Sequence, residues 1–427
     1  MSDKADKTFV GFGFGAIQSG LFLFEARTSG NFSRFVVAEV DRSLVQAIVA
    51  NDGRCRVNVA GGDRVDRLEL SGIEIYNPAV PADRQAIIEA IAASDEIATA
   101  LPSVRFYDTG DDTSVAGIIA EGLSSRESPQ PTVIYAAENH NRAAEILSDS
   151  VRQRMGQRRL SGVQTLNTVI GKMSGVIDEQ DVIRKANLAT ITPEIPRAIL
   201  VERFNRILIS RINLAGYRRG IEVFIEKDDL LPFEEAKLYG HNAIHALIGY
   251  LADLAGYETV AEAGGDAEIM AAARSAFLDE SGAALTRRHA KLGDRLFTPD
   301  GFGDYAEDLL ERMVCPNLND LVARVCRDHV RKLGYDDRLY GSMQLALGAG
   351  IQPTNLALGA AAAVISMIKR QHEIDAEIAH LPQSTEELTE MKLGKLLMGL
   401  WSENVDSDGE RLIGLTWAAL RKLQDRA

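Results

Sequence analysis

Hydrophobic residues in the first half of the chain form short runs, separated by longer segments of mixed polarity. The runs at residues 9–12, 35–40 and 132–136 are rich in β-branched and aromatic side chains, a composition typical of buried strands. The segments between them, such as 84–93 and 142–154, have the length of helices. Strands that alternate with helices predict βαβ units and a parallel sheet.

After about residue 200 the strand signals fade. Long segments such as 233–255 and 267–290 carry apolar residues at the spacing of helices. Pro193 and Pro196 oppose a continuous helix between the two halves. We therefore predict an α/β protein with a parallel-sheet domain over residues 1–200 and a mainly α-helical domain over residues 201–427.

Composition and charge exclude some partners. The 427 residues include 61 acidic and 47 basic side chains, and the formal net charge of −14 repels nucleic acid. Three cysteines are too few for a disulfide framework and fit a reducing compartment. The first ten residues lack the pattern of a secretory signal. The longest apolar stretch, 356–368, is shorter than the roughly 20 residues of a membrane span, so we expect it to form a buried core helix. We expect a cytoplasmic protein without nucleic-acid or membrane partners.

A glycine-rich stretch, FGFGAIQSG, follows the first predicted strand. Gly13 and Gly15 lie where the strand should turn into a helix, so that backbone N–H groups and the helix N-terminus can approach a pyrophosphate. The second strand carries Glu39 near its end, where a carboxylate can bind both ribose hydroxyls of adenosine and repel a 2′-phosphate. This combination predicts a Rossmann-type domain that binds NAD rather than NADP. Asp41 is an alternative ribose ligand, and a plain turn beside a surface glutamate is the alternative to the whole motif.

The third glycine of the usual fingerprint is absent. Gln18 stands in its place, and Gly20 follows two residues later. We expect the helix to pack on the sheet differently at this point.

The segment 233–257 is helix-like and carries Lys237, Asn242 and His245. In an α-helix these spacings keep the three side chains within about 140° of arc, so they can converge on one small ligand. A lysine with a depressed pKa can take the proton of an alcohol as hydride leaves for NAD, and an amide can hold the developing alkoxide. This arrangement suits alcohol oxidation.

The pattern K-x-x-x-x-N-x-x-H, present as KLYGHNAIH, resembles the catalytic helix of the polyol-specific long-chain dehydrogenases, the mannitol dehydrogenase family. The stretches FGFGAIQSG, VIYAAENH, NTVIGKM and PNLNDLVARVCRDHVRKLGYDDRL also resemble segments of that family, so the similarity spans roughly residues 8–370. Ala16 and Ser19 depart from the asparagine and arginine of its mannitol-phosphate enzymes, and the tail beyond about 380 is longer.

The resemblance implies a helical substrate domain beside the Rossmann domain and assigns roles to individual residues. Lys237 would be the general base, Asn167 and Asn242 the ligands of the alkoxide, and His245 a ligand of a substrate hydroxyl. The cofactor residues would be Gly13, Gly15, Gly20 and Glu39, with Glu138 and Asn139 near the nicotinamide.

The reaction we expect is NAD-dependent oxidation of a linear sugar alcohol or its phosphate, with mannitol 1-phosphate to fructose 6-phosphate as the best candidate. Arg331 and Arg338 could clamp the phosphate, or they could form salt bridges with Asp336 and Asp337. An unphosphorylated polyol or a sugar acid (uronate) is the alternative substrate. A nonenzymatic NAD-binding regulatory protein is the alternative class.

His241 and His245 form an H-x-x-x-H pair with the spacing of metal ligands. No glutamate follows the first histidine and no third ligand stands out. The sequence therefore favours a metal-independent site.

Overall fold

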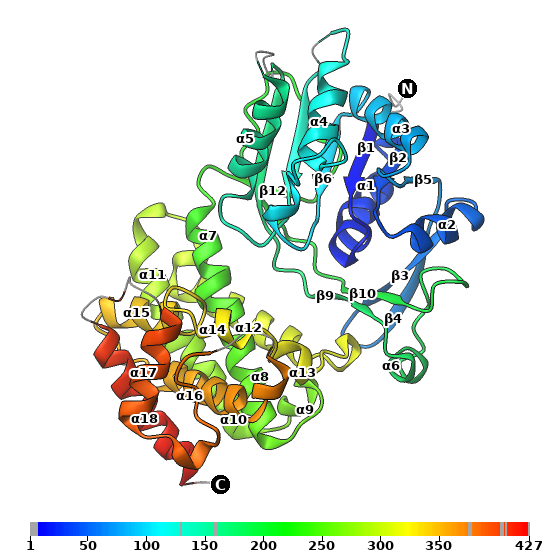
Figure 1. Cartoon of the computed structure of the whole chain (residues 1–427). Helices are drawn as coiled ribbons and strands as arrows, with labels where there is room; N and C mark the ends of the chain where they lie inside the picture. Colours follow the sequence, from blue (N-terminus) through cyan, green and yellow to red (C-terminus); the bar gives the residue numbers. More distant parts are fainter. Residues whose placement is uncertain are drawn as a thin grey trace. The chain divides into compact units, whose positions relative to one another are not determined.

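The computed structural model describes residues 7–128, 130–156, 161–374, 378–401, 405 and 408–425. The chain divides into two compact units, Met1–Leu231 and Pro232–Ala427, which we call unit 1 and unit 2 (Figure 1). The first combines a large sheet with helices, and the second is built from helices. The predicted fold class, an α/β chain with a helical second half, is confirmed.

The large sheet of unit 1 has the topology of a dinucleotide-binding fold. Its order is β12-β11-β8-β7-β6-β1-β2-β5. The six strands from β8 to β5 are parallel, and their order from β5 corresponds to 3-2-1-4-5-6, with the switch point between β1 and β6. The strands are β1 (Lys7–Phe12), β2 (Phe32–Ala38), β5 (Ile73–Tyr76), β6 (Glu96–Thr99), β7 (Thr132–Ala136), β8 (Val163–Val169), β11 (Leu208–Ser210) and β12 (Ile225–Lys227).

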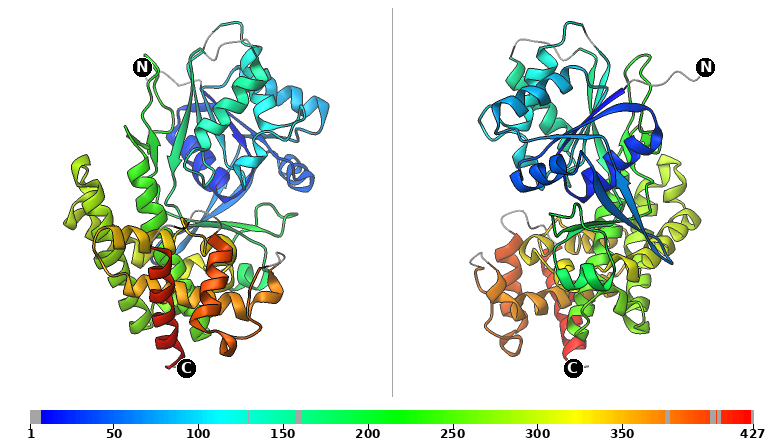
Figure 2. Two further views of the ribbon diagram at one scale, coloured as in Figure 1. Left: turned by 60° about the vertical axis from the view of Figure 1, so that its left-hand side comes forward. Right: turned by 90° about the vertical axis from the view of Figure 1, so that its right-hand side faces the viewer.

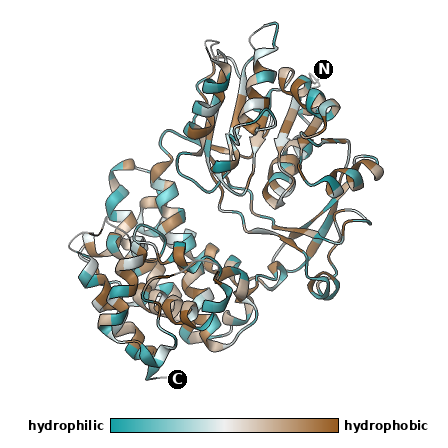
Figure 3. Cartoon of the chain, viewed as in Figure 1, coloured by the Kyte–Doolittle hydropathy of each residue, from teal (hydrophilic) through white to brown (hydrophobic). Residues whose placement is uncertain are grey.

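Side chains of these strands alternate between two hydrophobic cores, one on each face of the sheet. In β2, Phe35 and Val37 join one core and Val36 joins the other. The first core includes residues of the π-helical turn η1 (Gln18–Leu23), α1 (Phe24–Ser29) and α2 (Arg42–Ala50). The second includes α3 (Pro81–Ala92), α4 (Val115–Ser124) and α5 (Ala143–Met155). Helices thus cover both faces (Figure 2), and hydrophobic residues gather on the strands and the helix faces turned to them (Figure 3).

A smaller sheet extends unit 1, in the order β4-β3-β10-β9. Its strands are β3 (Cys55–Ala60), β4 (Val65–Leu70), β9 (Ser174–Ile177) and β10 (Ala198–Glu202), with α6 (Gln180–Lys185) between the last two. Gly20 of η1 lies so close to β10 that a Cβ on it would be 2.4 Å from the Val201 side chain. This close approach explains why glycine stands at position 20.

Unit 1 continues about thirty residues beyond the boundary at 200 that the two prolines suggested. Strands β11 and β12 complete the large sheet, and the segment between them is tied to the fully buried carboxylate of Glu96. Glu96 accepts hydrogen bonds from the Tyr217 hydroxyl (3.0 Å) and from the backbone N–H of Gly220. Burial raises the pKa of Glu96. Residues 201–231 therefore belong with the sheet, a long-range pairing that the local sequence pattern does not reveal.

Unit 2 is a helical bundle around one apolar helix, α16 (Thr354–Lys369), in which residues 356–368 are all buried. This confirms the core helix expected at that position. Helix α16 packs on α8 (Ala243–Ala255) and α18 (Gly409–Gln424). The remaining helices are α7 (Leu231–Glu235), η3 (Ala236–Asn242), α9 (Val260–Ala263), α10 (Ala267–Ser275), η4 (Ala276–Gly282), α11 (Ala283–His289), α12 (Pro299–Met313), α13 (Val322–Val325), α14 (His329–Lys332), α15 (Tyr340–Gly348) and α17 (Glu390–Trp401), joined in places by short 3₁₀ turns.

The tail beyond residue 380, for which the sequence offered no role, closes the bundle through α17 and α18. The Trp401 ring packs against Tyr335 and Tyr340, and its indole N–H donates to the Leu333 carbonyl at 2.9 Å. The Tyr340 hydroxyl lies 3.3 Å from that of Thr416. The tail is therefore part of the core of unit 2. No helix formed by the described residues has the length and apolarity needed to cross a membrane.

Candidate active site

The segment with Lys237 and Asn242 is not a regular α-helix. Residues Ala236–Asn242 form the π-helical turn η3, which connects α7 to α8. Hydrogen bonds in a π-helix join residues five apart, so Lys237 and Asn242 lie one above the other on the same face. The α-helical estimate of a 140° arc was therefore too wide. The K-x-x-x-x-N spacing matches the turn that the backbone adopts.

Lys237 is half-buried, and its pKa is lowered to about 8 by burial and by the guanidinium of Arg338. Glu234 acts in the opposite direction, but with a smaller effect. A lysine with this pKa is about one-tenth neutral at pH 7, far more than at the ordinary lysine pKa of about 10.4, and the neutral amine is the form that acts as a general base.

His245, one turn further along, is held by a partner that the sequence analysis did not identify. Its Nε2 lies 2.8 Å from an Asp320 carboxylate oxygen, and Asp320 also accepts from Arg324 at 2.6 Å. Burial alone would raise the pKa of Asp320, but His245 and Arg324 outweigh it and the pKa falls to about 2. Asp320 is therefore ionised and fixes the ring of His245, which leaves Nδ1 for other contacts.

His241 lies between Lys237 and His245 on the same helix. Its side chain is buried, its Nδ1 has no hydrogen-bond partner, and its ring centroid is 6.4 Å from that of His245. Burial and the nearby positive groups lower the pKa of His241 well below its ordinary value. A neutral His241 adds no positive charge beside Lys237. Among the described residues, no three His, Cys, Asp or Glu side chains are grouped as metal ligands.

In unit 1 the glycine loop turns at the switch point of the sheet. Gly13 has φ +84°, donates to the Ala38 carbonyl at 2.8 Å, and lies so near the Ala100 carbonyl that a Cβ would approach it to 3.0 Å. Around the position that a Cβ on Gly15 would take, no atom lies within 4 Å. The loop thus combines a left-handed turn with an open backbone surface, which is the shape that a pyrophosphate needs.

Gln18, at the position of the missing third glycine, is accommodated by another glycine. Its side chain is fully buried, and a Cβ on Gly11 of β1 would lie only 2.1 Å from its Nε2. Neither Nε2 nor Oε1 of Gln18 has a hydrogen-bond partner. The helix passes from Ala16 and Ile17 into the π-turn η1 at Gln18, whose side chain takes the space that a Cβ on Gly11 would need.

Glu39 and Asp41 follow β2 and differ in the number of hydrogen bonds and ion pairs that their carboxylates form. Asp41 caps α2 through the Ser43 N–H (3.0 Å) and forms an ion pair with Arg197 (2.7 Å). Glu39 accepts only the Asp41 N–H, at 2.8 Å through Oε1, so its Oε2 has no partner among the described residues. Val40 between them is 77% exposed. Glu39 is thus the carboxylate with free capacity at this edge of the sheet.

Comparison with known proteins agrees with this geometry. The Mannitol dehydrogenase C-terminal domain family matches residues 229–392. A mannitol-1-phosphate 5-dehydrogenase of Geobacillus thermodenitrificans is 30% identical over 333 residues, which cover 77% of this chain and 79% of that protein. The enzyme of the same name from Brevibacillus brevis is 29% identical over 383 residues, 88% of this chain and 90% of its own length.

The chain belongs to the mannitol dehydrogenase family. This confirms the resemblance read from KLYGHNAIH and the expected oxidoreductase class. Solved structures show the same fold. Pseudomonas fluorescens mannitol 2-dehydrogenase, in a complex with NAD and D-mannitol, aligns with TM-score 0.71 and 15% identity over 99% of this chain and 92% of its own. A D-sorbitol dehydrogenase aligns with TM-score 0.74 and 14% identity over 99% and 94%.

Glu138 and Asn139, which the family resemblance singled out in unit 1, lie directly after one another in the chain. Glu138 is buried and accepts from the Leu101 N–H (2.8 Å), the Thr99 hydroxyl (2.9 Å) and the Tyr107 hydroxyl, and burial raises its pKa. It therefore anchors the loop after β6. Asn139 follows it directly, in the loop after β7.

Asn167 binds the first turn of α5. Its Oδ1 accepts from the Ala144 N–H at 2.8 Å, and its Nδ2 donates to Glu145 at 2.9 Å. Asn167 belongs to β8 and is not the N-cap residue of α5, which is Arg142, so this contact joins two elements that are separate in the sequence.

Arg331 and Arg338 are not equivalent. The Arg338 side chain is 11% exposed, donates to Asp337 at 2.8 Å and lies near enough to lower the pKa of Lys237. Arg331 is 48% exposed and pairs with Asp328 (3.3 Å) and Asp337 (3.6 Å). The structure associates Arg338 with the Lys237 group and places Arg331 in a surface ion-pair cluster.

Proposed function

We propose that this mannitol dehydrogenase family member is an NAD-dependent dehydrogenase of a linear polyol or polyol phosphate, with mannitol 1-phosphate and fructose 6-phosphate as the preferred pair. The observation that carries the proposal is the π-turn that stacks Asn242 over Lys237, whose pKa is about 8. The names of the curated relatives support the phosphorylated substrate, and the NAD and D-mannitol in the mannitol 2-dehydrogenase complex support the cofactor.

The residues of unit 1 fit NAD. The open backbone at Gly13 and Gly15 would receive the pyrophosphate, Gly20 allows the helix to approach the sheet, and Oε2 of Glu39 would accept from the adenosine ribose. The exposed Val40 side chain offers an apolar surface beside that ribose ligand. NAD, when bound, accepts the hydride. The same carboxylate disfavours the 2′-phosphate of NADP.

Lys237 would take the proton from the substrate hydroxyl as the C–H bond is broken. The Asn242 amide would donate to the oxygen as it becomes an alkoxide, and Nδ1 of His245 would meet a neighbouring hydroxyl of the chain. Because Asp320 holds Nε2 of His245, it acts as a positioning residue for that contact. No step requires a metal ion.

Asn167, with Glu138 and Asn139, stays in the proposed set through the family resemblance. For Asn167 to donate to the alkoxide, its Nδ2 has to exchange Glu145 for the substrate while Oδ1 keeps its bond to the Ala144 N–H. Glu138 would act through the loop after β6 rather than by direct contact, because its carboxylate is fully occupied.

An unphosphorylated polyol or uronate is a second candidate, and one observation favours it. Both arginines proposed for the phosphate are already paired with carboxylates of the same segment, Asp328 and Asp337. A neutral hydroxymethyl end would need no free guanidinium. Cys55, Cys315 and Cys326 form no disulfide, as expected in a reducing compartment, and we propose a cytoplasmic location.

The direct test is oxidation of NADH, followed by its absorbance, with fructose 6-phosphate, fructose and ketoses derived from sugar acids. We expect turnover with NADH and little with NADPH, and a higher kcat/KM for fructose 6-phosphate than for fructose. A preference for fructose or a uronate would replace the substrate assignment. NADH binding without turnover of any ketose or polyol would instead support the nonenzymatic alternative.

A further inference from the structure

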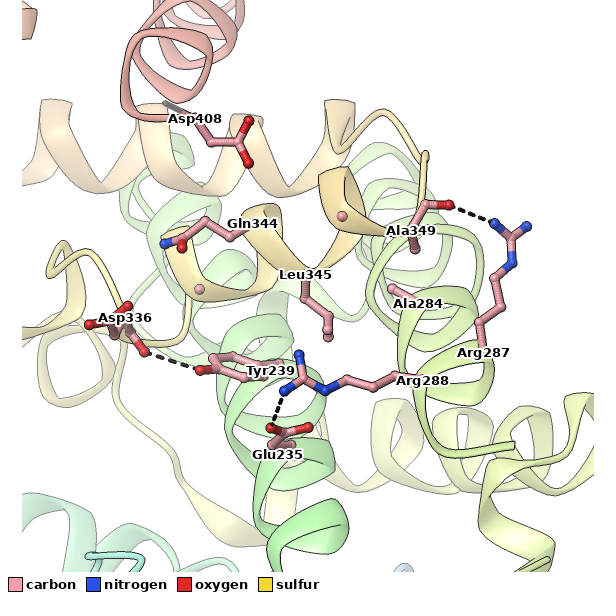
Figure 4. Close-up of a pocket in the computed structure, with 12 residues that line it drawn as sticks. Glu235, Tyr239, Ala284, Arg287, Arg288, Asp336, Gln344, Leu345, Ala349 and Asp408 are labelled. Atoms are coloured by element: carbon pink, nitrogen blue, oxygen red, sulfur yellow. Dashed lines mark hydrogen bonds and ion pairs between the residues drawn. The ribbon is translucent and has the colours of Figure 1, made fainter. Parts of the chain in front are cut away.

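A polar pocket opens in unit 2 beside the helix that carries Lys237. It has a volume of about 580 Å³ and is lined from η3, α11, α15 and the segments beside them (Figure 4). Glu235 and Tyr239, each two residues from Lys237, line it. Residues two apart on a helix point away from each other, so this pocket is separate from the Lys237 site.

The walls of the pocket differ in chemistry (Figure 4). Arg287 and Arg288 of α11 lie on one side, and Asp336, Gln344 and Asp408 lie on the other. Between them lie small and apolar residues, namely Ala284, Gly341, Leu345, Gly348 and Ala349. The guanidinium groups, which donate hydrogen bonds, therefore face carboxylate and amide oxygens, which accept them. The apolar residues between them can contact the C–H groups of a ligand.

Several of these groups have hydrogen-bonding capacity left. Arg287 donates only to the Ala349 carbonyl, at 2.9 Å, and pairs with no carboxylate among the described residues. The backbone carbonyl of Asp336 accepts a hydrogen bond from the Tyr239 hydroxyl. The carboxylate of Asp336 has no partner in the described part of the chain. Gln344 donates to the Tyr335 carbonyl at 2.6 Å, which leaves its side-chain oxygen as an acceptor. Arg288 is already bound to Glu235 at 3.1 Å.

We propose that this pocket is a noncatalytic binding site for a small polyhydroxylated anion of the sugar-phosphate class. The anionic group would bind Arg287 and Arg288, and the hydroxyls would donate to Asp336 and Gln344. The volume lies within the range of small-molecule sites. A bound ligand would contact Tyr239 and Glu235, and so the helix of Lys237, without entering the catalytic site. The inference does not depend on which substrate the enzyme oxidises.

The test is calorimetric titration of the full-length protein with glucose 6-phosphate, with glucose and inorganic phosphate titrated separately. Arg287→Ala removes the free guanidinium, and Gly348→Phe fills the pocket without a change of charge, since a Cβ on Gly348 meets no atom within 4 Å. Arg274→Ala is the matched control, because Arg274 is an exposed helical arginine in an ion pair outside the pocket.

We expect both pocket variants to weaken glucose 6-phosphate binding about tenfold or more and the control to bind as the wild type does. Hydrogen exchange should show that the ligand protects residues 283–289 and 336–349 in the wild type and not in Arg287→Ala. Wild-type binding in both pocket variants would overturn the proposal, as would protection confined to the segment 237–245. Neither result would affect the NADH oxidation assay, so failure of this site and failure of the proposed function can be distinguished.

Discussion

Replacing Gln18 by methionine should stabilise unit 1. The Gln18 side chain is fully buried with both polar atoms unpartnered. Leaving a buried polar group unsatisfied costs about 1–3 kcal/mol, and methionine has a similar volume without that cost. We expect the free energy of unfolding to rise by about 1–3 kcal/mol, which corresponds to a rise in Tm of roughly 2–12 °C for a unit of this size.

Scanning calorimetry measures this effect, with Gln46→Met on the exposed face of α2 as the control. The control should change stability by less than about 0.5 kcal/mol. Gly11→Ala should destabilise the same unit, since its Cβ would lie 2.1 Å from Gln18 Nε2, and the penalty should shrink in the Gly11→Ala, Gln18→Ala double variant. An unchanged or lower stability of Gln18→Met would show that the Gln18 amide has hydrogen-bond partners. Additive effects of the substitutions at positions 11 and 18 would show that the Gln18 side chain does not lie against Gly11.

Three further predictions concern binding and stability. Glu39→Ser should shift cofactor preference from NAD toward NADP in initial-rate assays, and an unchanged preference would remove Glu39 as the ribose ligand. Asp320→Asn should lower the stability of unit 2 by about 2 kcal/mol at pH 7, and the difference from the wild type in acid unfolding should disappear as the pH falls from about 4 to 2, because the lowered pKa of Asp320 stabilises the fold only above that range. Arg338→Ala should raise KM for fructose 6-phosphate far more than for fructose, while Arg331→Ala, in a surface ion pair, should have a smaller effect; equal losses on both substrates would contradict a phosphate contact.

Local patterns in the sequence were sufficient for the features that depend on neighbours in the chain. The alternation of strands and helices, the turn at Gly13 and the buried helix over 356–368 all follow from residue type and spacing. The group around Lys237 was also recognisable. Its spacing predicts an α-helix and not the observed π-turn, because a π-turn depends on backbone hydrogen bonds that periodicity does not report.

Features that depend on distant pairs could not be predicted. Asp320 is 75 residues from His245, and nothing in its local segment marks it as the partner. The end of unit 1 lies at 231 because Tyr217 and the residues after it bind Glu96 about 120 residues earlier. Asn167 is similar, since only the fold brings it to the first turn of α5.

The role of Lys237 as the base is tested by the pH dependence of NAD reduction by mannitol 1-phosphate, in the wild type and in Lys237→Met. Oxidation needs the neutral amine, so wild-type kcat/KM should rise with pH through a midpoint near the lysine pKa of about 8. Lys237→Met should lose about 10² to 10⁴-fold in turnover and lose this step, while the Kd for NADH, measured by fluorescence, stays nearly unchanged. A variant that keeps wild-type turnover with the same midpoint would show that another group is the base.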